Sequence, residues 1–193
     1  MLNQTDFQNM QKELEDYDSQ RELLIKKSRD VLKLSKQIIY AVHRGDLKQA
    51  QSQIKDIEAQ LAQLNQITKP STFLLSEGSY KIAVQEYVEA ILYFEVIKNN
   101  KLPTHTQLKV SSNHYLLGLC DLTGEIVRKA VYLAGKDQYQ EVIKFKDLVD
   151  QIYGELLKFN FRENEIRRKF DSIKYDLKKL EDLVLDLKLK GKL

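Results

Sequence analysis

The sequence predicts an all-α protein, an elongated bundle of about six to seven helices. Its 193 residues include only two prolines and seven glycines, which leaves few positions for tight turns. Charged residues make up 31% of the chain and apolar residues 42%, a balance typical of long amphipathic helices. Apolar residues recur three and four positions apart, and no alternation typical of a strand persists for more than a few residues.

Each predicted helix ends at a recognisable break. The helices are expected over residues 5–43, 47–67, 71–99, 113–133, 138–157 and 164–190. Gly45 and Asp46 separate the first two, as a C-terminal stop and the next N-cap. Pro70 separates the second from the third, the segment 101–113 predicts a loop, and Gly135 ends the fourth helix. We find no internal repeat or linker, so residues 1–193 are expected to form a single domain.

Composition also limits the class of protein. The formal charge of +3 is too small by itself to indicate a nucleic-acid binder, although residues 162–192 are locally basic.

The single cysteine, Cys120, cannot form an internal disulfide, and its apolar neighbours predict a buried thiol in a reducing compartment. The first residues lack the apolar core of a signal peptide, and no apolar run is long enough to span a membrane. We therefore expect a cytoplasmic protein without a membrane partner.

The stretch from Lys81 to Lys98 carries the strongest functional signal. Its apolar residues surround the helix on all sides, which predicts a helix buried in the bundle. Glu86 and Glu89 stand three residues apart on one face of it, whereas Glu95 points the other way and is expected at the surface. A buried carboxylate without a partner must shift its pKa or bind a cation. Glu86 and Glu89 are therefore candidate ligands.

A second acidic pair follows about thirty residues later. Asp121 and Glu125 lie four residues apart, and Gly118 and Arg128 lie along the same helical line. If the two helices pack face to face, four carboxylates meet, which is the kind of ligand set that Mg²⁺ or Mn²⁺ requires. The competing interpretation is an ordinary solvated face, because acidic pairs at helical spacing commonly form surface salt bridges.

Other familiar catalytic motifs are absent. The sequence contains no CxxC pair, HExxH motif, glycine-rich phosphate loop or GxSxG elbow. His43 ends the first predicted helix, His105 lies in the predicted loop, and His114 precedes Asp121 on the same helix. His114 is a weak candidate for a catalytic role, since an isolated histidine is more often a cap or a hydrogen-bonded bystander.

Several segments resemble the translin and translin-associated factor X family. They are EYVEA at residues 86–90, YLLG followed by DLTGE at residues 115–125, and KFDSIKYDLKKLEDLVLDLKLKG at residues 169–191. Residues 28–44 also resemble the first helix of factor X. The resemblance covers nearly the whole chain and is most specific at the acidic motifs.

The resemblance implies both an activity and an assembly. In the factor X branch, the acids of EYVEA and DLTGE form a metal-dependent endoribonuclease centre. Typical translin subunits lack the first pair and act mainly as binders of single-stranded RNA and DNA. This chain has all four acids, although its last helix looks more like translin. The resemblance thus implies a translin-like hollow homo-octamer in which Mg²⁺, or Mn²⁺, is bound by catalytic carboxylates, namely Glu86, Glu89, Asp121 and Glu125.

Cleavage of RNA at four carboxylates would also require cations nearby, because the acids repel the phosphate backbone. The candidate nucleic-acid-binding residues are Arg21, Lys26, Arg29, Lys33, Lys36, Tyr80, Lys81 and Arg128. Any one lysine is more simply a solvated surface residue. Tyr80 could stack on a base or belong to the core. Arg128 could contact a phosphate or pair with Glu125.

Two other functions compete with a nuclease. One is a non-catalytic protein that binds single-stranded nucleic acid in the manner of translin. The other is a purely structural assembly in which the last helix, rich in leucine from Leu177 to Leu187, joins copies of the chain. Metal-dependent cleavage of RNA would favour the nuclease, and a lack of affinity for RNA and DNA even at low salt would favour the structural assembly.

Overall fold

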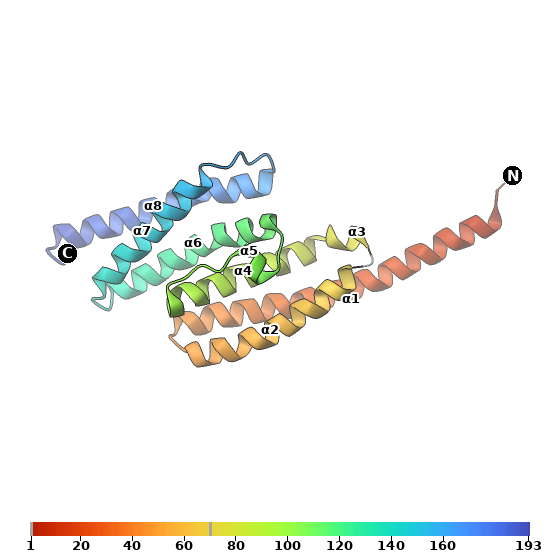
Figure 1. The fold of residues 1–193 in the computed structure, drawn as a ribbon, viewed down its shortest axis with the longest axis horizontal. Helices are drawn as coiled ribbons and strands as arrows, with labels where there is room; N and C mark the ends of the chain where they lie inside the picture. The colour runs from red at the N-terminus through yellow and green to blue at the C-terminus, as the bar shows by residue number, and fades with distance from the viewer. Residues whose placement is uncertain (1, 70) are drawn as a thin grey trace.

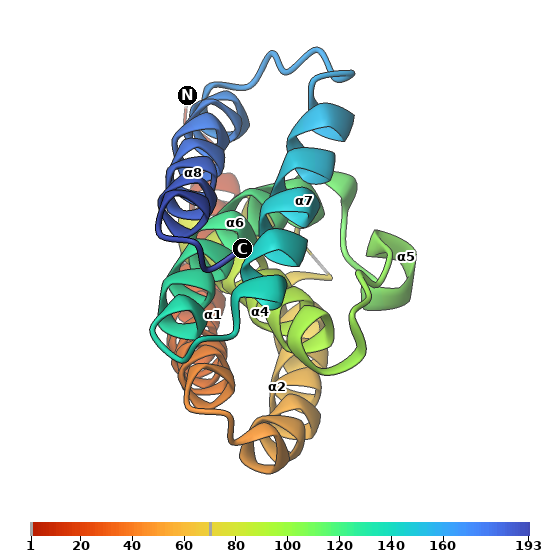
Figure 2. The same ribbon diagram turned by 90° about the vertical axis from the view of Figure 1, so that its left-hand side faces the viewer.

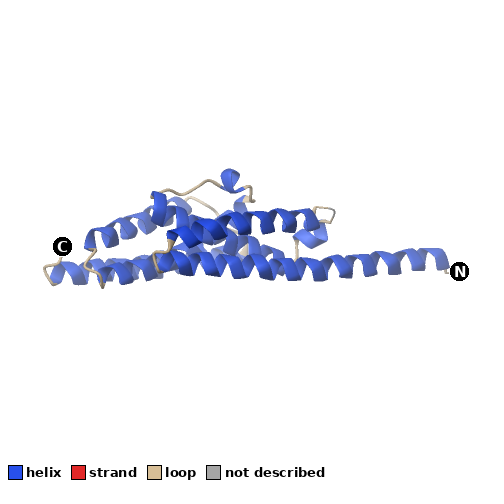
Figure 3. Cartoon of the chain, turned by 90° about the horizontal axis from the view of Figure 1, so that it is seen from below, coloured by secondary structure: helices blue, strands red, loops and turns tan. Residues whose placement is uncertain are grey.

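The computed structural model describes residues 2–69 and 71–193, and within them every regular element is a helix (Figure 3). The helices are α1 (Gln4–His43), α2 (Leu47–Thr68), α3 (Thr72–Leu75), α4 (Gly78–Asn99), α5 (His105–Leu108), α6 (Ser112–Ala134), α7 (Tyr139–Leu156) and α8 (Asn164–Leu189). The predicted all-α class is confirmed. Five of the six long helices lie within a residue or two of their predicted bounds, whereas the third begins at Gly78 and not at residue 71.

Two short helices were not predicted. α3 interrupts the segment expected to form one continuous third helix, because the chain turns at Ser76 and Glu77 before α4 begins. α5 occupies part of the predicted loop, where Thr104 and Gln107 form a capping box. The proline predicted to separate the second and third helices, Pro70, lies outside the described residues.

Local signals set the helix ends as expected. The Asp46 side chain accepts a hydrogen bond of 2.9 Å from the Gln49 N–H at the start of α2. Gly45 turns between α1 and α2 with φ +80°, a left-handed conformation that glycine adopts without a Cβ clash. At the end of α4, Asn100 takes the left-handed cap position with φ 50°.

The long helices form two groups that meet at α4 and α6. α1, α2 and α4 pack together, α6, α7 and α8 form the second group, and α4 packs against α6 between them (Figures 1 and 2). Buried apolar side chains of both groups form one continuous core. α4 is buried on nearly all sides, which confirms the expectation from its sequence.

Burial and hydropathy agree with two further expectations. Cys120 is buried, and burial raises the pKa of its thiol to about 12. Among residues 2–69 and 71–193, no helix is both long enough and apolar enough to cross a membrane. The N-terminal part of α1 extends beyond the ends of the other helices, and the side chains of its residues 4–16 are exposed (Figure 1).

Candidate functional site

A glycine sets the close approach of the two acidic helices. A Cβ built on Gly118 of α6 would lie 2.7 Å from Val88 Cβ and 2.9 Å from the backbone oxygen of Gln85, both on α4. No larger residue fits at this distance without displacing one helix. Gly118 therefore allows α4 and α6 to approach closely, one turn before Asp121.

All four predicted carboxylates open onto two adjoining hollows at this helix pair. Glu86 and Glu89 line both of them. Glu125 completes the acidic lining of the first hollow, which has a volume of about 310 Å³. Asp121 and Asp176, the latter from α8, complete the acidic lining of the second hollow, which has a volume of about 350 Å³. The structure thus brings the two acidic stripes together on one side of the molecule.

The two carboxyl groups of the α4 pair have no direct partner in the described part of the chain. Neither Glu86 nor Glu89 forms a hydrogen bond or ion pair with another described residue. Burial, together with the negative charges of Asp121, Glu86 and Glu125, raises the pKa of Glu89 to about 8. Burial also raises the pKa of Glu86, and Lys36 opposes that shift. A cation near this pair would favour its ionised form.

The α6 acids, by contrast, are already partnered. Lys169 Nζ of α8 donates a hydrogen bond of 2.6 Å to Asp121 Oδ1, and Gln85 Nε2 donates one to Asp121 Oδ2. Glu125 contacts His43 Nε2 and lies 3.7 Å from Arg128 Nη1. The hydrogen bond from His43 is the main cause that lowers the pKa of Glu125 below its ordinary value. The two acidic pairs therefore differ in electrostatic character.

The donor set suits a hard divalent cation, but it is not arranged as a finished metal cluster. Within residues 2–69 and 71–193, no group of three or more histidine, cysteine or acidic side chains is placed to bind one ion. Carboxylate oxygens are the ligands that Mg²⁺ and Mn²⁺ prefer. Glu86 and Glu89 are free to act as ligands, whereas Asp121 and Glu125 would first exchange Lys169 and His43 for the ion.

Three of the predicted basic residues lie together beside the acids. Arg29, Lys33 and Lys36 line a third hollow, of about 510 Å³, along α1. Lys36 and Tyr40 also line the hollow that contains Glu125 and Arg128, so the two hollows adjoin. A basic strip, defined here as Arg29, Lys33 and Lys36, therefore leads to the carboxylates.

Three of the remaining basic candidates, Arg21, Lys26 and Lys81, lie apart from this strip. Arg21 Nε pairs with Glu77 Oε1 at 2.9 Å, which ties the start of α4 to α1. Lys26 and Lys81 are exposed and line none of these three hollows. Arg128 is more than half exposed and close to Glu125, so both roles expected of it are sterically open.

Tyr80 lies in the core, the second of the two roles considered for it. Its side chain is buried, and its hydroxyl donates a hydrogen bond of 3.0 Å to Asn65 Oδ1. His114 packs edge-on against the Tyr80 ring and bonds to the Ser111 hydroxyl. Both line a hollow that contains none of the four acids. His114 therefore bonds to the N-cap residue of α6, Ser111, and is separate from the acidic site.

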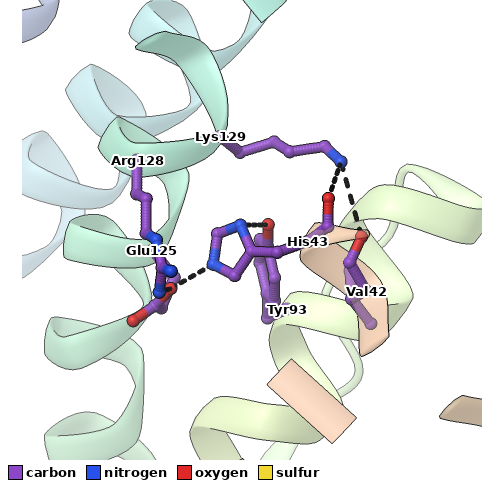
Figure 4. Close-up of polar contacts among 6 residues, drawn as sticks. All are labelled: Val42, His43, Tyr93, Glu125, Arg128 and Lys129. Atoms are coloured by element: carbon purple, nitrogen blue, oxygen red, sulfur yellow. Dashed lines mark hydrogen bonds and ion pairs between the residues drawn. The ribbon is translucent and has the colours of Figure 1, made fainter. Parts of the chain in front are cut away.

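Sequence reasoning missed several residues that complete the site. Lys169 and Gln85 bind Asp121. His43 contacts Glu125 and is bonded in turn to Tyr93 (Figure 4). His43 is 82 positions from Glu125 and Lys169 is 48 from Asp121, so no local spacing connects them. The only available signal for His43 was its place at the end of a predicted helix.

Known proteins share both the sequence pattern and the fold. Translin-associated protein X of Mus musculus is 25% identical, in an alignment covering 96% of this chain and 78% of the mouse protein. The structure of apo-NeC3PO superposes with a TM-score of 0.87 at 28% identity, covering 96% of this chain and 97% of that one. The structure of AfC3PO with duplex RNA superposes with a TM-score of 0.86 at 21% identity. The superposition covers 96% of this chain and 97% of the AfC3PO chain.

The family match extends over most of the chain. The sequence model described as the Translin family matches residues 19–191, a range that includes the basic strip, both acidic pairs and Lys169. This agrees with the resemblance noted at the acidic motifs and the last helix. The chain belongs to the translin family.

Proposed function

We propose that this protein is a metal-dependent endoribonuclease that acts on single-stranded RNA. The observation that carries the proposal is the convergence of Glu86, Glu89, Asp121 and Glu125 on two adjoining hollows between α4 and α6. Four carboxylates on one face are costly unless a cation or a proton balances them. Glu89, the most buried of the four, has the pKa raised furthest.

The four acids are the proposed ligands of Mg²⁺, with Mn²⁺ as a substitute. When bound, the ion would lower the pKa of a water molecule and neutralise charge that develops on the phosphate. The contact with His43 holds the pKa of Glu125 below its ordinary value and keeps Glu125 anionic, as a ligand of the ion must be, in the hollow that it shares with Glu89. Arg128 and Lys36 line the same hollow and would hold the phosphate against the acids.

Single-stranded RNA and DNA are the proposed ligands of the basic strip. Arg29, Lys33 and Lys36 are exposed along α1 and lead into the acidic hollow, so they can bind successive phosphates and bring the chain to the carboxylates. AfC3PO, whose fold this chain shares, forms a complex with duplex RNA, which supports a nucleic-acid ligand. Cleavage would be specific for RNA over DNA only if residues of the site contact the 2′-hydroxyl.

A homo-octameric shell is the proposed assembly. Exposed apolar side chains on two helices support self-association: Phe7 and Leu14 on the projecting part of α1, and Leu185 and Leu189 on α8. Light scattering coupled to gel filtration should then give eight times the chain mass of 22.6 kDa. A monomer at micromolar concentration would exclude the shell.

The nuclease is tested with end-labelled single-stranded RNA in Mg²⁺, in Mn²⁺ and in EDTA. Cleavage is expected with either ion and not in EDTA. The double substitution Glu86→Gln with Glu89→Gln should abolish it while preserving side-chain shape. Glu95→Gln on the same helix is the matched control, since Glu95 lines neither acidic hollow. Equal cleavage by wild type and the double variant would show that the four acids are not the catalytic centre.

The alternative is a non-catalytic translin-like protein that binds single-stranded nucleic acid. One observation favours it: Asp121 and Glu125 already have partners in Lys169 and His43, so that their charges are balanced within the chain. In that case, RNA binds with the same affinity in EDTA as in Mg²⁺ and remains intact. The cleavage assay, run alongside a gel-shift titration, separates the two functions.

A further inference from the structure

His43 links three helices at the edge of the acidic site. It is the last residue of α1, and its ring lies between Tyr93 of α4 and Glu125 of α6 (Figure 4). Tyr93 Oη lies 3.0 Å from His43 Nδ1, and His43 Nε2 contacts Glu125 Oε2. Only 9% of the His43 side chain is exposed, so water competes weakly for these contacts.

A buried lysine holds the backbone of the same residue. Lys129 Nζ donates to the carbonyl oxygens of Val42 and His43, each at 3.4 Å (Figure 4). These carbonyls belong to the end of α1, where backbone acceptors lack partners within the helix and attract a cation. Lys129 stands four residues after Glu125 on α6. One face of α6 therefore contacts both the side chain and the backbone of His43.

The hydrogen-bond chain has one consistent direction when the imidazole is neutral. The Glu125 carboxylate can only accept, so His43 Nε2 must carry the proton that it donates. Nδ1 is then an acceptor, and the Tyr93 hydroxyl donates to it. Tyr93 is fully buried, and its hydroxyl has no other partner in the described part of the chain. Glu125 thus sets the tautomer, and the buried tyrosine satisfies the second ring nitrogen and holds the orientation of the ring.

These contacts leave one oxygen of Glu125 available. His43 Nε2 and Arg128 Nη1 both approach Oε2, and no described residue bonds to Oε1. Glu125 also lines the hollow shared with Glu86 and Glu89. Its carboxylate is therefore held at the wall of that hollow through Oε2, while Oε1 has no bond to a described residue.

We propose that His43 is a positioning residue for Glu125, with Tyr93 holding the orientation of its ring and Lys129 holding its backbone. The proposal rests on the proposed function, since it makes Glu125 Oε1 the oxygen offered to the cation. His43, Tyr93 and Lys129 would then affect catalysis only through the position of Glu125. The competing role is structural: the same contacts could merely fasten the end of α1 to α4 and α6.

Mn²⁺ binding to the full chain without RNA tests the positioning role. His43→Leu removes the donor and should weaken Mn²⁺ binding and kcat by about 10- to 100-fold, the usual effect of removing a residue that orients a metal ligand. His43→Gln keeps an N–H at a similar distance and should recover much of this loss. KM for RNA should change little. His114→Leu, which alters a half-buried histidine away from the acids, is the matched control.

A double-mutant cycle separates positioning from a structural role. On a Glu125→Gln background, His43→Leu should cause no further loss of Mn²⁺ binding, because both substitutions act through one carboxylate. Additive losses would show that His43 acts elsewhere. If the leucine variant fails to fold by circular dichroism, the glutamine variant and Tyr93→Phe carry the same test, with the phenylalanine variant expected to lose Mn²⁺ affinity in the same direction.

Imidazole ¹⁵N NMR gives a readout that does not depend on catalysis. When its imidazole is neutral, wild-type His43 should be in the single Nε2–H tautomer, and Glu125→Leu, which removes the acceptor, should produce a mixture. A mixture in wild type would overturn the proposal. If wild type neither binds Mn²⁺ nor cleaves RNA, the proposed function fails and the inference fails with it. If wild type binds Mn²⁺ and cleaves RNA, and His43→Leu does so equally well, only the positioning role of His43 is wrong.

Discussion

Lys169 Nζ lies 2.6 Å from Asp121 Oδ1, so α8 provides a cation directly to an acid of the hollow between α4 and α6. The ammonium group occupies an oxygen that the proposed ion would use, and its charge repels that ion. Both effects weaken binding of the ion. The unliganded protein therefore balances part of its acidic site with its own last helix.

Lys169→Met should strengthen Mn²⁺ binding. Removing one partly exposed positive charge beside the acids should raise the affinity by roughly three- to tenfold, at an effective dielectric constant near 20. Isothermal titration of the protein with Mn²⁺ measures the change. Lys178→Met, at an exposed ion pair on the same helix, should leave the affinity unaltered. Weaker binding in the Lys169 variant would show that the lysine supports the site and does not compete with the ion.

Glu89 should make the folded protein less stable as the pH rises. Its pKa is about 8 when folded and near 4.5 when unfolded, so between these values the folded state holds a proton that the unfolded state has released. Raising the pH through this window therefore costs up to about 1.4 kcal/mol of unfolding free energy per pH unit. Above the folded pKa the loss is complete.

The test is urea unfolding between pH 5 and pH 9 in EDTA. Glu89→Gln should be more stable than wild type at pH 8, with the difference shrinking toward pH 5. Glu95→Gln serves as the control and should follow the wild-type curve. A constant difference between wild type and the Glu89 variant at every pH would contradict the raised pKa. Added Mn²⁺ should recover stability in wild type more than in the Glu89 variant.

Gly118→Ala should weaken both the fold and the site. The new methyl group would meet Val88 and the Gln85 backbone at under 3 Å, so α4 and α6 must separate. Such overpacking costs about 1–3 kcal/mol, which exceeds the gain of under about 1 kcal/mol in helix propensity. Chemical denaturation measures the cost, and Mn²⁺ titration measures the effect on the four carboxylates.

Gly154→Ala is the matched control for that substitution. Gly154 also lies inside a helix, α7, but a Cβ there would meet nothing within 4 Å. Alanine at this position should stabilise the protein by roughly 0.5–1 kcal/mol. If the two alanine variants had equal stability, close packing of α4 and α6 would not be the reason that position 118 requires glycine.

The basic strip should determine how RNA affinity depends on salt. Arg29→Gln with Lys33→Gln should weaken binding of single-stranded RNA, and the slope of log affinity against log salt should flatten by about 0.7 for each phosphate that the variant no longer neutralises. Fluorescence anisotropy at several KCl concentrations gives the slope. Lys48→Gln with Lys55→Gln removes the same number of charges from α2, away from the strip, and should have a smaller effect. Identical slopes for both pairs would mean that only net charge matters.

The projecting part of α1 should contribute to assembly. Phe7 and Leu14 are 54% and 65% exposed, lie seven residues apart on one side of the helix, and touch no core. Phe7→Ser with Leu14→Ser should lower the mass measured by light scattering without changing the helical signal. Gln4→Ser with Gln11→Ser is the control on the same segment. An unchanged mass in the apolar double variant would place the contact between copies elsewhere.

The sequence by itself determined the helical class, the six long helices and the two acidic pairs. Periodicity and end signals such as Asp46 are local, so they can be read along the chain, and the all-apolar surroundings of Glu86 and Glu89 already indicated burial. The tertiary structure alone decided which groups balance those acids. His43 and Lys169 reach Glu125 and Asp121 from α1 and α8, and Tyr80 turns into the core. Contacts between helices depend on how the helices pack, and no spacing along one helix encodes them.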